Sequence, residues 1–228
     1  MALKQNLKIL YEDADIIVCI KPVGIASQGS RGFKQDMTDL LKLHIQTMTG
    51  KKGEPYLGIV HRLDQPVSGI MVYAKNAVAA ASLSAQAASD KMKKRYYAVL
   101  EGCPSREEGV LTDYLLRDGR TNMSSVVPEA RKKENGVKRA ELSYSVMKKK
   151  EALCLVEIEL KTGRHHQIRV QFSHIGCPLY GDRKYHVTTE GRELALFSHY
   201  LEFVHPGTGK NMYFDETPES GIFTEFFE

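Results

Sequence analysis

The apolar residues near the start of the chain follow two different periods. A continuous apolar run over residues 16–20 stops just before Pro22, which is typical of a buried strand that ends at a turn. Apolar side chains then recur at helical spacing from Met37 to Met48, and Gly50 follows as a stop signal. This pattern predicts a buried strand followed by a helix with one apolar face.

The same alternation of strand and helix continues. The apolar run from Gly69 to Lys75 predicts a second strand. Asn76 is a good helix cap, and an alanine-rich stretch follows it to about Ser89, which predicts a second helix.

Strand patterns dominate from Arg95 onward. Alternating or β-branched runs predict strands over residues 95–102, 110–116, 140–147, 152–160 and 194–206. Residues 165–175 predict a helix with Ile168, Phe172 and Ile175 on one face and Gly176 as its stop. We therefore expect an α+β fold around a largely antiparallel mixed sheet with a few flanking helices. Without repeats or a linker, one catalytic domain over residues 1–228 is the simplest organisation.

The composition is that of a globular protein, with 42% hydrophobic and 26% charged residues. The N-terminal segment lacks the apolar core of a signal peptide, and no run reaches the ~18 apolar residues of a membrane span. We expect a cytoplasmic protein without a membrane partner. The four cysteines show no CxxC spacing, which gives no support for a zinc site or a disulfide framework.

Positive charge is concentrated in two stretches, although the net charge is only +4. Residues 131–150 carry eight Lys or Arg against two Glu, and residues 91–95 carry a second cluster. Such clusters can replace counterions along a phosphate backbone. The alternative is a solvated surface that promotes solubility.

Two short segments carry candidate chemistry. His61-Arg62-Leu63-Asp64 lies in a tight connection before a strand, where functional side chains are often displayed. The alternative is a capped turn with a surface Arg–Asp pair. Residues 162–169 place two Arg, two His and a Gln at a helix start, where they can donate to phosphates or base edges. The alternative is an ordinary basic helix start. Neither segment has the spacing of a metal site, so we expect no metal.

These segments resemble the motifs of the RluA-type pseudouridine synthase family, almost from end to end. The similarity covers ILYEDADIIVCIKPVGIASQG, HRLDQPVSGIMVYAKN, KRYYAVLEG, LKTGRHHQIRVQFSHIGCPLYGDRKY and LFSHYLEFVHPGTGKNMYF, in the order of the family. The chain begins directly with the catalytic region, so we expect no N-terminal S4-like RNA-binding domain.

The resemblance implies a role for each matching residue. Asp64 falls on the family's catalytic aspartate, Arg62 on its companion arginine, Tyr96 on the active-site aromatic and Arg164 on the basic partner of the aspartate. Ile168 falls on an apolar floor residue. The Lys21-Pro22 turn matches a family feature that we take as structural. Further candidates for substrate binding are His61, His166, Gln167 and Arg169.

Two positions depart from the family pattern, since Val67 and His165 stand where Thr is commoner. They affect the expected substrate preference more than the reaction. The implied reaction isomerises uridines in structured RNA, either ribosomal or transfer RNA, by flipping the target base. It transfers no electrons or external groups, so we expect no cofactor. DNA is not expected as a partner, and we expect a monomer.

The sequence leaves two chemical roles open for the carboxylate of Asp64. It can attack as a nucleophile, or it can remove a sugar proton on the way to a glycal-like intermediate. An alternative function is an RNA-binding or RNA-chaperone protein of the same fold with dispensable catalysis. A glycoside hydrolase would need a second catalytic acid near Asp64, and no such pair stands out.

Overall fold

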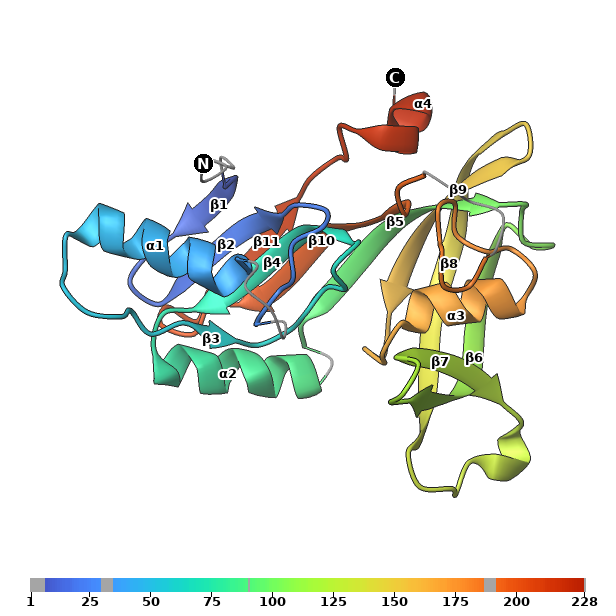
Figure 1. The fold of residues 1–228 in the computed structure, drawn as a ribbon, viewed down its shortest axis with the longest axis horizontal. Coiled ribbons are helices and arrows are strands. Elements are labelled where there is room, and N and C mark those ends of the chain that lie inside the picture. Colours follow the sequence, from blue (N-terminus) through green and yellow to red (C-terminus); the bar gives the residue numbers. More distant parts are fainter. Residues whose placement is uncertain (1–6, 30–34, 90, 187–191, 228) are drawn as a thin grey trace. The chain divides into compact units, whose positions relative to one another are not determined.

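The chain divides into two compact units. The computed structural model describes residues 7–29, 35–89, 91–186 and 192–227 (Figure 1). Unit 1 comprises residues 1–93 and 198–216, and unit 2 comprises residues 94–197 and 217–228. The prediction of a single catalytic domain over residues 1–228 stays a prediction.

Unit 1 is a sheet with two helices. Its elements are β1 (Ile9–Glu12), β2 (Ile16–Lys21), α1 (Met37–Thr49), β3 (Gly58–Ile59), β4 (Ser68–Ala74), α2 (Ala77–Ala88), β10 (Leu196–Val204, in this unit from Ser198) and β11 (Asn211–Asp215). The strand order is β1-β2-β4-β10, with β3 beside β4 and β11 beside β10. The pairs β1–β2, β2–β4, β3–β4 and β10–β11 are antiparallel.

The core of unit 1 explains its continuous apolar runs. Ile16 and Val18 of β2 pack with Ile70 of β4 and Leu83 of α2 in one buried cluster. The alternate residues of both strands, which point to the opposite face, are also fully buried. A strand that is buried on both faces has no polar side to display, so its sequence reads as an uninterrupted apolar run.

Unit 2 carries the longer strands. Its elements are β5 (Lys93–Glu101, in this unit from Lys94), β6 (Glu108–Asp118), β7 (Met123–Val127), the 3-10 turn η1 (Glu129–Arg131), β8 (Val137–Lys150), β9 (Leu153–Leu160), α3 (Gln167–His174), the 3-10 turn η2 (Gly221–Phe223) and α4 (Thr224–Phe227). The strand order is β5-β9-β8-β6-β7, and all four pairs are antiparallel.

Helix α3 packs against the sheet of unit 2. Val170 joins a small buried cluster with Leu115 of β6 and Ala140 of β8. Phe172 is fully buried, and its ring meets that of Tyr144 at a centroid distance of 5.5 Å. The start of α3 is therefore fixed by the core, which matters for the motif that lies just before it.

The structure confirms the α+β class with its largely antiparallel strands. The expected helix caps are present as well: Gly50 ends α1 with φ 64°, and the Asn76 side chain accepts a bond from Ala79 N at 2.8 Å. The short strands β1, β3, β7 and β11 were not predicted. Met48 was expected on the apolar face of α1 but is 71% exposed.

The helix expected from residue 165 begins two residues later. His166 has φ 53° and ψ 24°, a left-handed conformation that cannot continue a right-handed helix. At the other end, Ile175 lies outside the helix and is 39% exposed, so it does not share the buried face of Ile168 and Phe172.

None of the helices in the described ranges is long and apolar enough to cross a membrane.

Candidate active site

Asp64 lies in the loop between β3 and β4 of unit 1. The residues on either side, Leu63 and Val67, are only 6% and 2% exposed, and Val67 N donates to Asp64 O at 3.0 Å. Asp64 itself is half-buried and Arg62 is exposed. The loop therefore turns over two buried apolar anchors and leaves its charged side chains near the surface. Val67 acts here as an anchor, a role that does not require the hydroxyl of Thr.

His61 is tied to the neighbouring strand. Its Nε2 accepts a hydrogen bond from the backbone N–H of Val72 at 3.1 Å. A ring nitrogen that accepts a bond carries no proton, so this contact selects the neutral tautomer protonated on Nδ1. The bond holds the first residue of the motif against β4 and so fixes one end of the Asp64 loop.

The Lys21–Ser27 segment holds the Asp64 loop on both sides of Asp64. Before it, the Ser27 hydroxyl donates to Leu63 O at 2.7 Å and accepts from Leu63 N at 3.0 Å. After it, Gly24 N donates to Gln65 O at 2.9 Å, and Gln65 Nε2 donates to Gly24 O at 2.9 Å. Three of these bonds fix the backbone of the residues that flank Asp64, and the fourth holds the Gln65 side chain.

Lys21 lies at the base of this arrangement and is fully buried. Its ammonium donates to the carbonyls of Pro22, Ile25 and Gln65 at 2.9, 2.7 and 3.1 Å. Burial lowers the pKa of Lys21 to about 8, and the nearby negative charge of Asp64 acts in the opposite direction. A buried lysine thus joins three backbone positions and places positive charge near Asp64.

The amino-acid sequence did not identify Lys21 and Ser27 as supports of Asp64. The Lys21-Pro22 pair was noted only as a structural turn. A lysine at the end of a continuous buried strand was the signal that was available, because such a charge must find buried acceptors. Ser27 gave no comparable signal.

The loop leads into β4 through a glycine that no other residue can replace without strain. Gly69 has φ 126°, and a Cβ atom there would lie 2.4 Å from Ser198 O and 2.5 Å from Ser198 N of β10. The close approach of β10 therefore requires glycine, which explains the Gly of the motif.

In unit 2, Gln167 holds together the turn that precedes α3. Its side-chain oxygen accepts bonds from Thr162 Oγ1 at 2.7 Å and from Arg164 N at 3.0 Å. Its Nε2 donates to Glu141 O at 3.0 Å. Since Gln167 is only 3% exposed, these contacts orient the turn that carries Arg164.

His166 is packed in the same region. Its ring stacks on that of His165 at 3.8 Å, and its Nδ1 lies 2.8 Å from the Tyr185 hydroxyl. His165 in turn is held by Ser124, whose hydroxyl donates to His165 O at 2.9 Å. The two histidines connect the motif to β7 and to the segment after α3.

The two arginines of this motif have different surroundings. Arg164 is exposed, and its Nε donates to Arg139 O at 2.9 Å. Arg169 is 3% exposed, and its Nε and Nη2 bind the two carboxylate oxygens of Asp182 at 2.8 and 2.7 Å. Arg164 is therefore accessible to a ligand, whereas the guanidinium of Arg169 is engaged in a buried bidentate ion pair.

Tyr96 and Ile168 provide buried apolar surface in unit 2, with 6% and 4% exposure. Tyr96 lies on the same face of β5 as Lys94, because side chains two residues apart on a strand point the same way. Lys94 Nζ in turn lies 3.9 Å from the position of a Cβ on Gly163. The turn at residues 162–164 therefore lies close to the β5 face that carries Tyr96.

The candidate residues thus form two groups. His61, Arg62 and Asp64 are brought together in unit 1 on the loop before β4. Tyr96 and the residues from Arg164 to Arg169 belong to unit 2, on β5 and at the start of α3.

Much of the positive charge in residues 131–150 is paired. Arg131 lies 2.7 Å from Glu134, Lys132 2.8 Å from Glu129, and Lys149 2.8 Å from Glu107. Lys150 pairs with Glu225 and Arg139 with Glu141. Such exposed pairs contribute only about 0–1 kcal/mol each, so a phosphate group can compete for these side chains.

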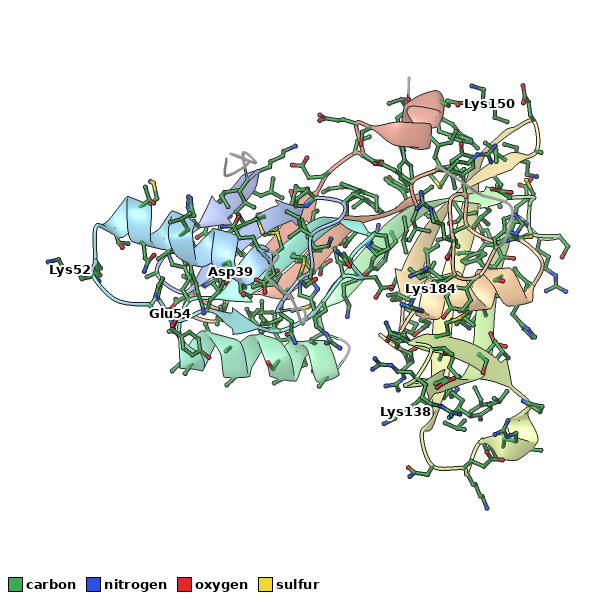
Figure 2. All side chains as sticks on the ribbon, in the orientation of Figure 1. Asp39, Lys52, Glu54, Lys138, Lys150 and Lys184 are labelled. Atoms are coloured by element: carbon green, nitrogen blue, oxygen red, sulfur yellow. The ribbon has the colours of Figure 1, made fainter. Side chains whose placement is uncertain are left out.

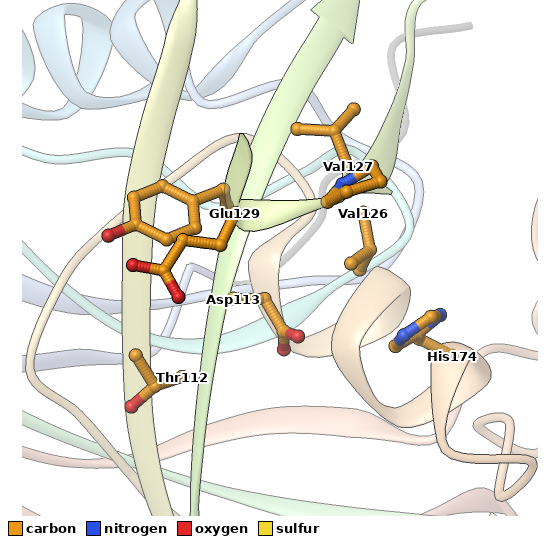
Figure 3. Close-up of a pocket in the computed structure, with 8 residues that line it drawn as sticks. Thr112, Asp113, Val126, Val127, Glu129 and His174 are labelled. Carbon is orange, nitrogen blue, oxygen red and sulfur yellow. The ribbon is translucent and has the colours of Figure 1, made fainter. Parts of the chain in front are cut away.

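Two other features contain none of the candidate site residues. An open pocket of about 390 Å³ in unit 2 is shown in Figure 3. Its lining residues are Thr112, Asp113, Tyr114, Val126, Val127, Pro128, Glu129 and His174.

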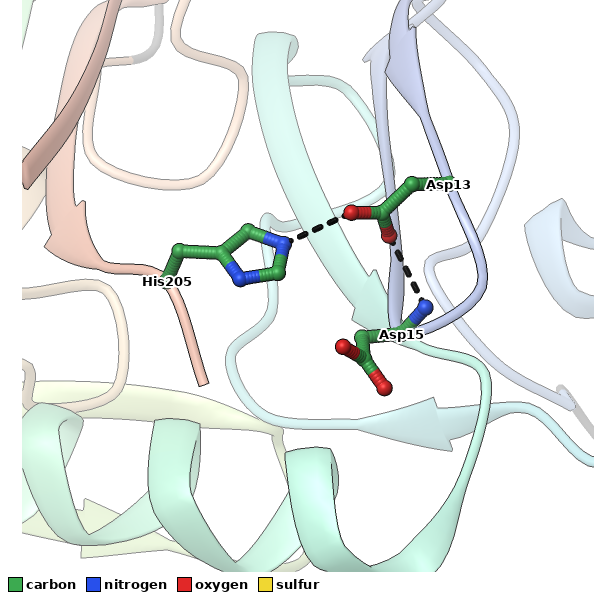
Figure 4. Close-up of side chains that lie close together, drawn as sticks. All are labelled: Asp13, Asp15 and His205. Atoms are coloured by element: carbon green, nitrogen blue, oxygen red, sulfur yellow. Dashed lines mark hydrogen bonds and ion pairs between the residues drawn. The ribbon is translucent and has the colours of Figure 1, made fainter. Parts of the chain in front are cut away.

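In unit 1, Asp13, Asp15 and His205 form a cluster of possible metal ligands within the described residues (Figure 4). His205 Nε2 is 2.8 Å from Asp13 Oδ2, and His205 Nδ1 accepts bonds from Gly207 N and Thr208 N at 3.1 Å. Both ring nitrogens are therefore engaged, as expected of a structural cluster rather than a metal site.

Comparison with known proteins agrees with the motifs. Residues 15–174 match the family model described as RNA pseudouridylate synthase. The chain is 34% identical over 218 residues to the uncharacterized RNA pseudouridine synthase YlyB of Bacillus subtilis, covering 94% of this chain and 70% of that protein. It is 33% identical over 222 residues to ribosomal large subunit pseudouridine synthase D of Pseudomonas aeruginosa, covering 91% of this chain and 67% of that protein.

The fold has a solved counterpart in the structure of human RNA Pseudouridylate Synthase Domain Containing 4. The TM-score is 0.76 at 24% identity, and the match covers 93% of this chain and 89% of the human chain. The human structure shows the fold, and the family model and the curated relatives place the chain in the RNA pseudouridylate synthase family, as an isomerase of the RluA type that its motifs resemble.

Proposed function

We propose that this enzyme converts specific uridines of structured RNA to pseudouridine with Asp64 as its catalytic carboxylate. The observation that carries the proposal is the way in which the Asp64 loop is held in place. Hydrogen bonds from the Lys21–Ser27 segment fix its backbone, and the buried side chains of Leu63 and Val67 anchor it in the core. Catalysis by a positioned group requires such preorganisation, since small displacements reduce the rate strongly.

The reaction breaks the bond between uracil N1 and C1′, rotates the base, and joins its C5 to the same carbon. The proton displaced from C5 is lost and N1 gains one, so no electrons or external groups enter. Asp64 acts either as a nucleophile or as a base toward the sugar. Either role needs the ionised carboxylate.

The target nucleotide has to leave the RNA stack, because C1′ and the base are shielded inside a folded RNA. We propose that its base is flipped out and stacks on Tyr96 above the apolar floor of Ile168. Unstacking costs a few kcal/mol, which stacking on an aromatic side chain and phosphate contacts can repay. The neighbouring Tyr97 packs on Phe227 at 5.0 Å, on the other side of β5, so Tyr96 is the better candidate.

We propose that some of the polar candidate residues contact the RNA directly and that others hold these residues in place. Arg62 and Arg164 are exposed and suited to direct contact with RNA, and Arg164 is the proposed basic partner of Asp64. Arg169, Gln167 and His166 are buried and bonded to protein groups. We therefore propose that these three position Arg164 and its turn. His61 is bonded to β4, and we propose that it positions the Asp64 loop.

Ribosomal RNA of the large subunit is the proposed substrate. Support comes from relatives named ribosomal large subunit pseudouridine synthase D in Zymomonas mobilis, at 32% identity, and in Pseudomonas aeruginosa, at 33% identity. Transfer RNA is the second RNA class to be tested.

The decisive experiment maps pseudouridines in total RNA from cells in which the gene is deleted. These cells are supplied with the wild-type protein, with the variant Asp64→Asn or with the control variant Asp118→Asn. Asp118 is an exposed carboxylate on β6. We expect one or more sites to disappear with Asp64→Asn and to persist with the control. Full modification in the Asp64→Asn strain contradicts the catalytic role, and loss restricted to transfer RNA contradicts the proposed substrate.

A further inference from the structure

One face of the sheet in unit 2 is covered by α3, and we call it the α3 face. Ala140 of β8 belongs to the buried cluster that contains Val170 of α3. The ring of Tyr144, also on β8, meets that of Phe172 of α3 at 5.5 Å. Successive side chains of a strand point to opposite faces, so Lys138 shares the α3 face with Ala140 and Tyr144.

Lys138 is an exposed cation on this face and is labelled in Figure 2. The register of β8 with β6 sets it directly opposite Leu115, which belongs to the same buried cluster as Ala140. The next residue, Arg139, points to the opposite face, where its guanidinium pairs with Glu141. Lys138 therefore presents its ammonium to solution from the α3 face, and its neighbour does not.

Lys94 on β5 lies on the α3 face as well. The strand registers set Tyr96 opposite Ile158 and Ile158 opposite Tyr144, so Tyr96 shares this face. Side chains two residues apart on a strand point the same way, which places Lys94 beside Tyr96. The two positions are about 7 Å apart along β5. Lys94 is therefore the cation next to the residue on which the flipped base is proposed to stack.

The turn that precedes α3 links the two lysines. Apart from the adjacent residues, Lys94 Nζ is the one described atom within 4 Å of the position of a Cβ on Gly163, at 3.9 Å. The space above Gly163 is thus open and borders an ammonium group. On the other side of the turn, Arg164 Nε donates to Arg139 O at 2.9 Å, and Arg139 directly follows Lys138. Lys94, Arg164 and Lys138 therefore follow one another across the α3 face.

The charges of the opposite face are paired, which distinguishes the two faces. The pairs are Arg95 with Glu157, at 4.0 Å, and Arg139 with Glu141. On the α3 face, the carboxylate of Asp113, which lies opposite Ala140, accepts a bond from the buried Gln171 at 2.7 Å. The α3 face thus has an excess of positive charge, which attracts a phosphate backbone.

We propose that Lys94 and Lys138 each bind a phosphodiester of the RNA strand that carries the target uridine, on either side of the turn before α3. This inference rests on the proposed function, because it places the strand beside the uracil that stacks on Tyr96. The base and the phosphate of one nucleotide are separated by a distance similar to that between Tyr96 and Lys94. Lys94 therefore fits the phosphate of the flipped nucleotide, and Lys138 fits one further along the strand. Phosphate contacts carry no sequence information, so the two lysines set the register of the RNA.

The test is the salt dependence of RNA binding by the full-length protein, measured by fluorescence anisotropy with a labelled single-stranded oligouridylate. Each phosphate contact with a single strand contributes about 0.7 to the slope of log K against log salt concentration. We expect Lys94→Met and Lys138→Met each to reduce the slope by about 0.7, and the double variant by about 1.4. The matched controls Arg95→Met and Arg139→Met remove the same charge from the opposite face and should keep the wild-type slope.

Lys94→Arg keeps the positive charge and should retain the wild-type slope, which separates phosphate binding from an effect on folding. An unchanged slope in Lys94→Met or in Lys138→Met overturns the assignment of that lysine. An equal reduction in the two lysine variants and the two controls overturns the proposal, because the face would then be irrelevant. The assay requires no catalysis, so it can also be carried out in the Asp64→Asn background. Pseudouridine formation by Asp64→Asn would contradict the proposed function, whereas unchanged slopes would contradict this inference alone.

Discussion

The Ser27 hydroxyl binds both backbone polar groups of Leu63, donating to its carbonyl at 2.7 Å and accepting from its N–H at 3.0 Å. Leu63 immediately precedes Asp64. The buried side chain of Ser27 therefore satisfies both backbone hydrogen-bonding groups of the residue next to the proposed catalytic aspartate, although the two residues are far apart in the sequence.

Replacing Ser27 by Ala should lower the free energy of unfolding by about 1–3 kcal/mol, because a buried N–H and a buried C=O lose their partner. Urea denaturation measures this change. Ser84→Ala, at an exposed position of α2, is the control and should not destabilise the protein. Equal denaturation midpoints for wild type and Ser27→Ala contradict the role of the hydroxyl.

Lys21→Met should destabilise the protein more than it slows the folded enzyme. The variant leaves the carbonyls of Pro22 and Ile25 without their buried donor, a loss of about 1–3 kcal/mol for each, whereas the Gln65 carbonyl keeps its bond from Gly24 N. Thermal unfolding and the rate of pseudouridine formation at low temperature separate the two effects. Lys52→Met, at an exposed lysine, serves as the control. Unchanged stability in Lys21→Met would show that these bonds contribute nothing.

The stability of the wild type should also rise between about pH 8 and 10.5 relative to Lys21→Met. Burial lowers the pKa of Lys21 from 10.5 to about 8, so in this range the unfolded chain binds the proton and the folded chain does not. Stability increases with pH wherever the unfolded state binds more protons. At 1.36 kcal/mol per pH unit the gain is about 3 kcal/mol. Parallel pH profiles from urea titrations of the two proteins are incompatible with this explanation.

The Arg169–Asp182 pair should show strong energetic coupling. Arg169→Met leaves a buried carboxylate uncompensated, with an expected loss of about 3–5 kcal/mol. Burial alone would raise the pKa of Asp182, but the bonds from Arg169 and from two backbone N–H groups bring the net pKa below its ordinary value. The double variant Arg169→Met/Asp182→Leu should lose much less than the sum of the single changes. Additive losses in a double-mutant cycle argue against coupling.

Gly69→Ala should be far more damaging than Gly24→Ala, although both glycines have positive φ values, of 126° and 84°. A Cβ at Gly69 would lie 2.4 Å from Ser198 O, whereas no atom lies within 4 Å of a Cβ at Gly24. Gly24→Ala should lower the free energy of unfolding only by the cost of placing an alanine in the left-handed conformation, about 1–2 kcal/mol. The soluble yield and melting temperature of the two variants provide the comparison, and similar values would mean that β10 can move aside.

The sequence was informative where structure is determined locally. The buried strand β2, the capped helix α2 and the glycine stop of α1 follow from neighbouring residues alone. The short strands β7 and β11 were missed because their exposed faces interrupt the apolar pattern, and their positions depend on partners elsewhere in the chain.

At the candidate site, residue type indicated the chemistry but not the surroundings. Arg164 and Arg169 look equivalent in the sequence, yet one is exposed and the other is paired with Asp182. The supports of Asp64 arise from contacts between distant segments, and the spacing of these residues along the chain gave no indication of them.

The return of the chain to unit 1 also has a consequence for synthesis on the ribosome. The β10 strand lies directly beside β4, as the contact between Gly69 and Ser198 requires, yet all of residues 94–197 are translated between them. The loop that bears Asp64 therefore leaves the exit tunnel long before its neighbouring strand exists. The greater part of unit 2, residues 94–197, has time to fold while unit 1 waits with an open sheet edge, which is the stage at which a nascent chain of this enzyme most needs protection from aggregation.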